Sequence, residues 1–134
     1  MTSRNLAKKV AGFAFSKKAF DVRLLDLRKV TDIADFFVIC SADSDIQVKA
    51  IADAVLDGLA GSDIYPWHRE GISQKQWILL DFVDVVVHVF HKDVRIFYGL
   101  EKLWGDARIE ELRDTPPPKK IRKKTPAPRA RGKK

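Results

Sequence analysis

Aspartates near the middle of the chain have the residue type and spacing that could hold a metal ion. Asp43 and Asp45 are two residues apart and follow directly on an apolar run, and Asp81 or Asp84 comes from a second apolar segment. Paired carboxylates after a strand, with a third from a neighbouring strand, can hold Mg²⁺ for nucleotidyl transfer. That chemistry also needs a Gly-Ser turn against the triphosphate, and the chain has Cys-Ser-Ala at 40–42 instead.

Two interpretations of these aspartates are therefore kept. The favoured one places Asp43 and Asp45 beside a helix N-terminus, where the helix dipole stabilises negative charge by about 0.3 to 1 kcal/mol. The alternative is a metal-dependent, nucleotidyltransferase-like enzyme that uses Asp43, Asp45 and Asp81. Because the phosphate turn is missing, we expect a protein without catalytic residues, bound metal or cofactor.

The histidines and the single cysteine form no pattern typical of a metal or nucleophile site. His68, His88 and His91 have no cysteine at ligand spacing. His88 and His91 are three residues apart on a predicted strand, so they point to opposite faces. No Ser or Cys nucleophile is suitably placed for His88 to activate. Cys40 lies in the apolar run FFVIC and is expected to be a small buried hydrophobe.

Large aromatic side chains are unusually frequent between residues 77 and 104. They are Trp77, Phe82, Phe90, Phe97, Tyr98 and Trp104. Most are expected in the core, but any that stay exposed would be typical anchors of a protein interface, because Trp and Tyr offer large contact areas with few rotors to freeze. Trp77 at the start of a strand and Tyr98, opposite the inward direction expected for Phe97, are the first choices.

The elements that position these residues are strands alternating with helices. Apolar spacing predicts a first helix with Leu6, Val10, Phe13 and Lys17 on one face. Strands are expected at 21–27, 36–42, 77–82 and 84–91, with a short edge strand at 64–68. The segments 77–82 and 84–91 should form an antiparallel hairpin with a very tight turn at Val83.

Two further helices complete the predicted fold. Ser44 and Gln47 form a capping box, followed by the stripe Ile46, Ile51, Val55 and Leu59 and a stop at Gly61. A last helix from Val94 to Trp104 is expected to present Phe97, Leu100, Leu103 and Trp104 to the sheet. The predicted fold class is α/β (α+β), with a mixed sheet of about five strands flanked by helices.

Charge divides the chain into two parts. Residues 1–113 contain sixteen Lys and Arg against seventeen Asp and Glu, whereas residues 114–134 contain nine basic residues and one aspartate. The sequence therefore predicts one nearly neutral domain, 1–113, and a disordered tail, 114–134, rich in Pro, Lys and Arg. No apolar run approaches the roughly 18 residues of a membrane span. The N-terminus lacks a secretory signal, so a cytoplasmic protein without membrane contact is expected, with a basic amphipathic organelle presequence as the open alternative.

Three segments, in this order, resemble the Iojap/RsfS family of ribosomal silencing factors. The first is TDIADFFVIC with the capping box and VKAIAD, the second is WILLDFVDVVVHVF at 77–90, and the third is FYGLEKLWGDA at 97–107. The resemblance covers roughly residues 3 to 107 and does not extend to the basic tail. It implies a nucleotidyltransferase-like fold without that superfamily's catalytic apparatus.

The resemblance also implies a function and a partner. Members of this family bind the large ribosomal subunit through ribosomal protein uL-fourteen, block joining of the small subunit and repress translation. Because ribosomal proteins are basic, acidic groups beside aromatic anchors would complement them. The expected contact residues are Trp77, Asp81, Asp84, His88, Tyr98 and Glu101.

Two questions about partners stay open at the sequence level. The tail residues Lys119, Lys120, Arg122, Lys123 and Lys124 are expected to contact ribosomal RNA phosphates, with a merely solubilising tail as the alternative. A homodimer of the free protein is the second open question.

Overall fold

The structure of the protein is a computed structural model, and it describes residues 1–114. The predictions for the basic tail, including its five RNA-contact residues, fall outside the described residues. No helix in the described part is both long enough and apolar enough to cross a membrane.

A six-stranded mixed sheet forms the centre of the molecule, in the order β3-β4-β5-β2-β1-β6. The strands are β1 (Phe20–Asp26), β2 (Phe36–Ala42), β3 (His68–Glu70), β4 (Trp77–Asp81), β5 (Val85–His91) and β6 (Arg108–Glu111). Only the central pair β2 and β5 is parallel among these strands, and the other four pairings are antiparallel. The mixed α/β class expected from the sequence is confirmed, with one strand more than expected.

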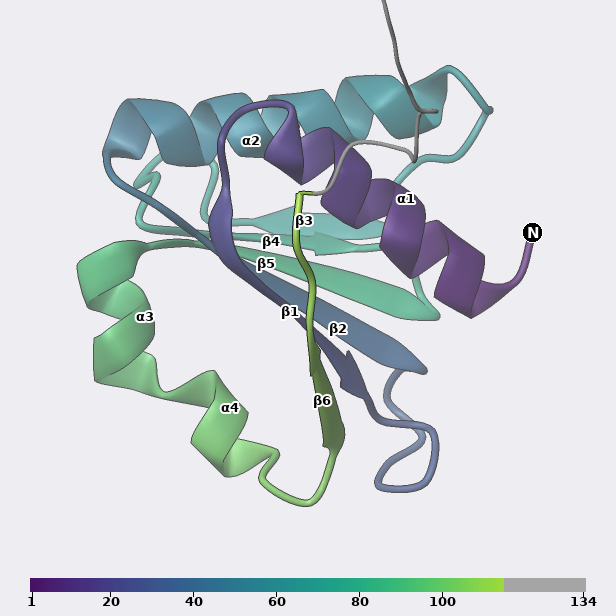
Figure 1. Cartoon of the computed structure of the whole chain (residues 1–134). Helices are drawn as coiled ribbons and strands as arrows, with labels where there is room; N and C mark the ends of the chain where they lie inside the picture. Colours follow the sequence, from purple (N-terminus) through teal and green to yellow (C-terminus); the bar gives the residue numbers. More distant parts are fainter. Residues whose placement is uncertain (115–134) are drawn as a thin grey trace, which may run out of the picture.

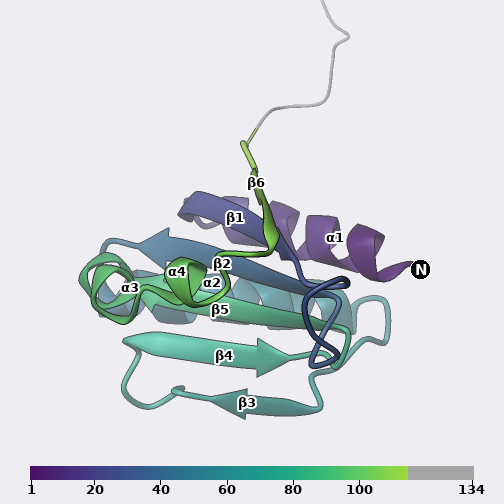
Figure 2. The same cartoon turned by 90° about the horizontal axis from the view of Figure 1, so that it is seen from below.

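Helices cover both faces of this sheet (Figures 1 and 2). Helices α1 (Ser3–Phe15) and α2 (Asp45–Ala60) pack side by side on one face. Helices α3 (Lys92–Tyr98) and α4 (Leu100–Leu103) lie on the opposite face, near the end of the sheet where β2 and β5 finish. This arrangement divides the core into two layers, one on each side of the sheet.

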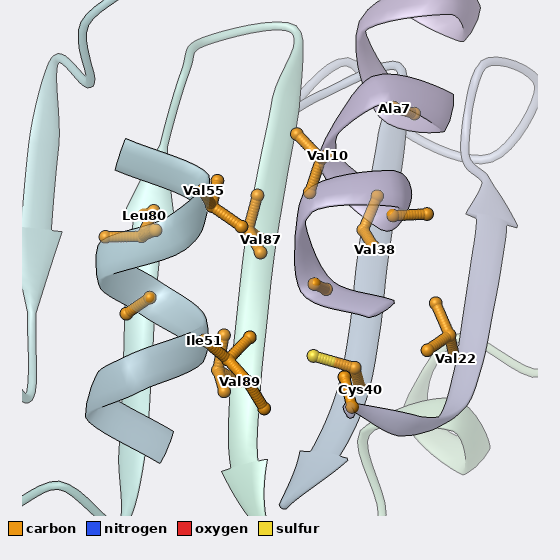
Figure 3. Close-up of a cluster of buried hydrophobic side chains, with 14 of the residues drawn as sticks. Ala7, Val10, Val22, Val38, Cys40, Ile51, Val55, Leu80, Val87 and Val89 are labelled. Atoms are coloured by element: carbon orange, nitrogen blue, oxygen red, sulfur yellow. The ribbon is translucent and has the colours of Figure 1, made fainter. Parts of the chain in front are cut away.

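The larger layer lies under α1 and α2. It contains Ala7, Val10, Val22, Val38, Cys40, Ile51, Val55, Leu80, Val87 and Val89, all fully buried or nearly so (Figure 3). Alternate residues of each strand point into it, as the twofold repeat of a strand requires. Cys40 therefore behaves as the small apolar side chain expected from the sequence, and burial raises the pKa of its thiol to about 12.

The smaller layer lies under α3 and α4. Its fully buried members are Leu25, Leu27, Ile39 and Phe90, and Trp77, Val94, Leu100 and Trp104 pack against them. β2 is buried along its whole length, because its residues alternate between the two layers. The prediction that 36–42 is a central strand, apolar on both faces, is confirmed.

The structure corrects several element predictions. The edge strand expected at 64–68 begins only at His68, and β6 was not foreseen. The last helix is two helices, because Gly99 takes a left-handed conformation with φ 56° and interrupts it. Ile46, Phe97 and Leu103, expected to face the core, are exposed. The helix α2 itself begins at the predicted cap, where Ser44 Oγ accepts a hydrogen bond from Gln47 N.

Candidate functional site

An aromatic cluster lies at the end of the sheet where α3 follows β5. The Trp77 ring stacks on Phe90 with a centroid distance of 4.8 Å and contacts Tyr98 at 4.8 Å, and Phe97 meets Tyr98 edge-on at 5.2 Å. Phe97 is 81% exposed, and Tyr98 is also exposed. We call Trp77, Phe97 and Tyr98 the aromatic surface. It brings together two of the residues singled out in the sequence and adds Phe97.

A depression of about 470 Å³ lies beside the aromatic surface. Gly71, Gln76, Trp77, Val94, Phe97 and Tyr98 contribute to its lining, which is mostly apolar. Gly71 can approach Trp77 only because it lacks a side chain: its φ is +81°, and a Cβ would stand 1.9 Å from the Trp77 carbonyl oxygen. The chain thus forms a shallow receptacle for an apolar side chain of another molecule.

His88 supports the aromatic surface from beneath. Its Nδ1 accepts a hydrogen bond of 3.1 Å from Trp77 Nε1, and its ring meets Phe37 at 4.6 Å. Burial lowers the pKa of His88 to about 3, so the ring is neutral and carries its proton on Nε2, which has no hydrogen-bond partner among residues 1–114. At 3% exposure, His88 cannot be the contact residue expected from the sequence. Its contribution is to orient Trp77.

Glu101 is half-buried, and its carboxylate is used in ion pairs within the protein. Its carboxylate accepts from Arg95 Nη2 at 2.7 Å and pairs with Arg23 Nη1 at 3.1 Å. Burial opposes ionisation, but the bonds to Arg95 and the charges of Arg95 and Arg23 outweigh it, so the pKa of Glu101 lies below its usual value.

The buried Arg95 ties α3 to distant parts of the chain. Its Nη1 donates to Ser41 Oγ at 2.9 Å and to the Asp21 carbonyl, while Nε and Nη2 reach Glu101 in α4. The guanidinium therefore joins α3 and α4 to the ends of β1 and β2. This network holds the short helices, and with them Phe97 and Tyr98, in a fixed place.

Asp81 and Asp84 lie at the other end of the sheet. Asp81 is the last residue of β4, four residues from Trp77, which corresponds to roughly 13 Å along a strand. Asp81 Oδ1 accepts from Val83 N at 2.8 Å and shapes the turn before Asp84. Asp81 and Asp84 therefore do not lie directly beside Trp77, and the expectation that Trp77, Asp81, Asp84 and Glu101 contact one partner stays a prediction. Two residues of one hairpin are close in space only if they lie at the same end of its strands.

The aspartates of the enzyme alternative are dispersed in the same way. Asp43 pairs with Lys92 at 3.2 Å, and Asp45 accepts from Gln76 Nε2 at 2.9 Å. Asp81 is opposite Val86 on β5, whereas the residue before Asp43 is opposite His91, roughly 17 Å further along the sheet. Across the described residues no group of three or more His, Cys, Asp or Glu is arranged to hold a metal ion. Asp43, Asp45 and Asp81 thus do not form a common metal site.

Phe97, Val94 and Gly71 belong to the site but were not identified from the sequence. Phe97 was assigned to the core because a continuous helix would place it on the same face as Leu100 and Trp104. Gly99 ends α3, so the residues after it no longer follow the helical spacing of the residues before it. A glycine at this position is a common helix C-terminus, and it could have indicated the break from the sequence. The sequence predicts that Gly71 lies in a loop, but it does not indicate that the backbone of Gly71 lies close to Trp77.

Comparison with known proteins decides the family. The model of the RsfS family, described as ribosomal silencing factor during starvation, matches residues 1–134. The chain belongs to the RsfS family. A ribosomal silencing factor RsfS from Bacillus subtilis is 43% identical over 112 residues, 84% of this chain and 95% of that protein. The resemblance noted in the sequence is thereby confirmed.

Other RsfS relatives extend the match. The chloroplastic protein Iojap of Zea mays is 37% identical over 109 residues, 81% of this chain and 47% of its own length. A crystal structure from Chromobacterium violaceum superposes with a TM-score of 0.76 at 33% identity, covering 78% of this chain and 88% of that one. One from Bacillus halodurans has a TM-score of 0.72 at 39% identity, covering 81% and 99%.

Proposed function

We propose that this RsfS protein binds the large ribosomal subunit through ribosomal protein uL-fourteen, blocks joining of the small subunit and thereby represses translation. Family membership supports the silencing role. The observation that carries the binding proposal is the aromatic surface, with an exposed Phe97 beside a rigidly held Trp77 and a lined depression. We place this action in the cytoplasm.

Binding, rather than catalysis, is what these residues support. Exposed aromatic rings around a depression are typical energetic centres of protein interfaces. Asp93 lines the same depression and offers a carboxylate to a basic partner. The enzyme alternative has no comparable support, because Asp43 is neutralised by Lys92 and Asp81 is remote from it.

Phe97→Ala tests the proposal with little risk to the fold, since the ring is exposed. We expect the affinity for purified large subunits, measured by co-sedimentation, to fall about 30-fold, which corresponds to a loss of about 2 kcal/mol at an interface centre. Ile109→Ala, on the far edge strand β6, is the matched control and should bind normally. Equal binding by the two variants would refute the assignment of the aromatic surface.

A subunit-joining assay separates silencing from mere binding. Purified large and small subunits should associate less when the wild-type protein is added in excess over large subunits. Phe97→Ala should restore association, and Ile109→Ala should not. If the wild-type protein binds large subunits without reducing association, the proposed mechanism of repression is wrong.

A further inference from the structure

Three loops meet at the end of the sheet opposite the aromatic surface. They are the β1–β2 loop, the β4–β5 turn and the segment that leads into β3, and Figure 2 shows them gathered away from α3. Backbone hydrogen bonds join them: Trp67 N donates to the Asp81 carbonyl at 2.7 Å, and Asp35 N donates to the Asp84 carbonyl at 2.8 Å. This end is therefore one connected structure, although its parts are far apart in the sequence.

Large apolar side chains are exposed on all three loops. Ile33, Trp67 and Val83 come one from each loop, and Trp67 is 78% exposed. We call these three residues the hairpin-end surface. A tryptophan with so little cover contributes little to the core, and exposed apolar groups that gather at one place are typical of interaction sites.

The charge around the hairpin-end surface is acidic. Asp32, Asp35, Asp81 and Asp84 lie on the same loops, and within residues 1–114 none of the four forms an ion pair. Arg28, in the β1–β2 loop, is already paired with Asp26 at 2.7 Å. Lys29 is a further cation of the β1–β2 loop, so the four aspartates outnumber the cations there. Carboxylates without an ion-pair partner repel RNA phosphates and attract cationic polypeptide, so the sign of the charge favours a basic protein over RNA.

We propose that the hairpin-end surface is a second docking site, occupied by a basic segment of a ribosomal protein other than the one bound at the aromatic surface. The segment would place an apolar side chain against Trp67 and its cations against the aspartates. This inference rests on the proposed function, which brings the protein to a particle rich in basic proteins.

The distance between the two surfaces allows both to be occupied at the same time. The seven residues of β5 span about 20 Å between them. Two contacts to one particle strengthen overall binding. Once the aromatic surface is bound, the hairpin-end surface is held near its own partner at a high effective concentration.

Photocrosslinking identifies the occupant directly. A benzophenone amino acid replaces Trp67 in one sample of the full chain and Phe97 in another, and each is bound to purified large subunits and irradiated. We expect position 67 to yield an adduct with a different ribosomal protein from position 97, identified by mass spectrometry.

Each other outcome overturns the inference. An adduct of position 67 with ribosomal RNA, with the chain's own tail or with the protein found at position 97 assigns another occupant. No adduct at position 67 while position 97 reacts refutes the second site but leaves the proposed function standing. No co-sedimentation and no adduct at either position would overturn both.

Affinity measurements check the energetic contribution. Trp67→Ala should weaken binding to large subunits about fivefold or more, as truncation of a contacting tryptophan typically does. Asp32→Asn with Asp84→Asn should weaken it and reduce its salt dependence, since neither carboxylate is used in a hydrogen bond within the described chain. Ile46→Ala, similarly exposed but on α2, should have no effect. Wild-type affinity for Trp67→Ala would contradict the proposal.

Discussion

Trp77 and His88 are in contact but have different roles at the aromatic surface. Both lie in the predicted hairpin, and both were expected to contact a partner. In the structure Trp77 is half-buried and lines the depression, whereas His88 lies beneath it with its Nδ1 accepting the indole N–H. Strand periodicity does not predict this difference, because the burial of His88 depends on Phe37 from a distant strand.

His88 should make the stability of the protein depend on pH. The unfolded state takes up a proton near pH 6.5, whereas the folded His88 stays neutral down to a pKa of about 3. Between these values the unfolded state binds more protons, so stability falls as pH falls, by up to about 1.4 kcal/mol per unit. The His88→Phe variant lacks this contribution. Its free energy of unfolding should therefore decline less steeply than that of the wild type as the pH falls.

Urea unfolding followed by circular dichroism from pH 7.5 to 4.5 measures both slopes. At pH 7 we expect the variant to be less stable than the wild type, because the Trp77 N–H loses its acceptor. The difference in free energy of unfolding between the wild type and the variant should become smaller toward pH 4.5. Parallel stability curves would show that His88 is not buried in neutral form.

At the scale of elements, signals local in sequence were the ones that predicted structure correctly. Ser44 caps α2 as expected, and the hairpin of β4 and β5 follows from two apolar runs around a tight turn. Gln47 departs from the capping box: its side chain accepts from Asp43 N and donates to the Lys17 and Lys18 carbonyls. That role depends on a segment about thirty residues away.

Elements whose formation depends on distant partners were missed. β6 is a short, mostly polar strand, Arg108–Glu111, and it is a strand because β1 offers it a free edge. No periodicity within four residues can indicate this. The break at Gly99 likewise allows Leu100 and Trp104 to pack while Phe97 stays outside.

Gly71→Ala should damage the site through its element. The left-handed φ and the clash with the Trp77 carbonyl would push the start of β4 away, at a cost of about 1 to 3 kcal/mol in stability. Affinity for large subunits should fall with it. Gly12→Ala, on α1 with nothing within 4 Å of the new Cβ, should instead gain about 1 kcal/mol. Thermal unfolding of both variants measures this, and similar shifts would argue against the close approach.

For the whole molecule, the sequence indicated the class of fold but not the arrangement of its functional surfaces. A mixed sheet with helices followed from composition and periodicity, and the strand order did not, since the pairing of β2 with β5 joins residues about fifty apart. Consequently six predicted contact residues were treated as one patch. Trp77 and Tyr98 belong to the aromatic surface, and His88 is buried beneath it. Glu101 belongs to a half-buried ion-pair network, and Asp81 and Asp84 lie at the opposite end of the sheet.

The uneven charge of the chain gives a prediction at this scale. Truncation after Asp114 removes nine cations from a domain with nearly balanced charge. If the tail binds RNA phosphates, the logarithm of the affinity for large subunits should depend less steeply on the logarithm of the salt concentration, by about 0.7 to 0.9 for each phosphate that the tail neutralises. Co-sedimentation between about 50 and 300 mM salt, the range over which such binding changes steeply, measures this slope. An identical slope with and without the tail would favour a solubilising role.

The pairing of β6 with β1 has a consequence for how the protein is made. Strand β1 cannot pair with β6 until β6, the last described strand, has been synthesised. The ion pairs of Arg4 and Lys8 in α1 with Glu110 in β6 also form only then. Contacts between the two ends of a chain form late and slow folding. The outer edge of β1 therefore stays unpaired while the rest of the sheet can already form, and the fold that would later bind a ribosome is completed only after β6 has emerged from one.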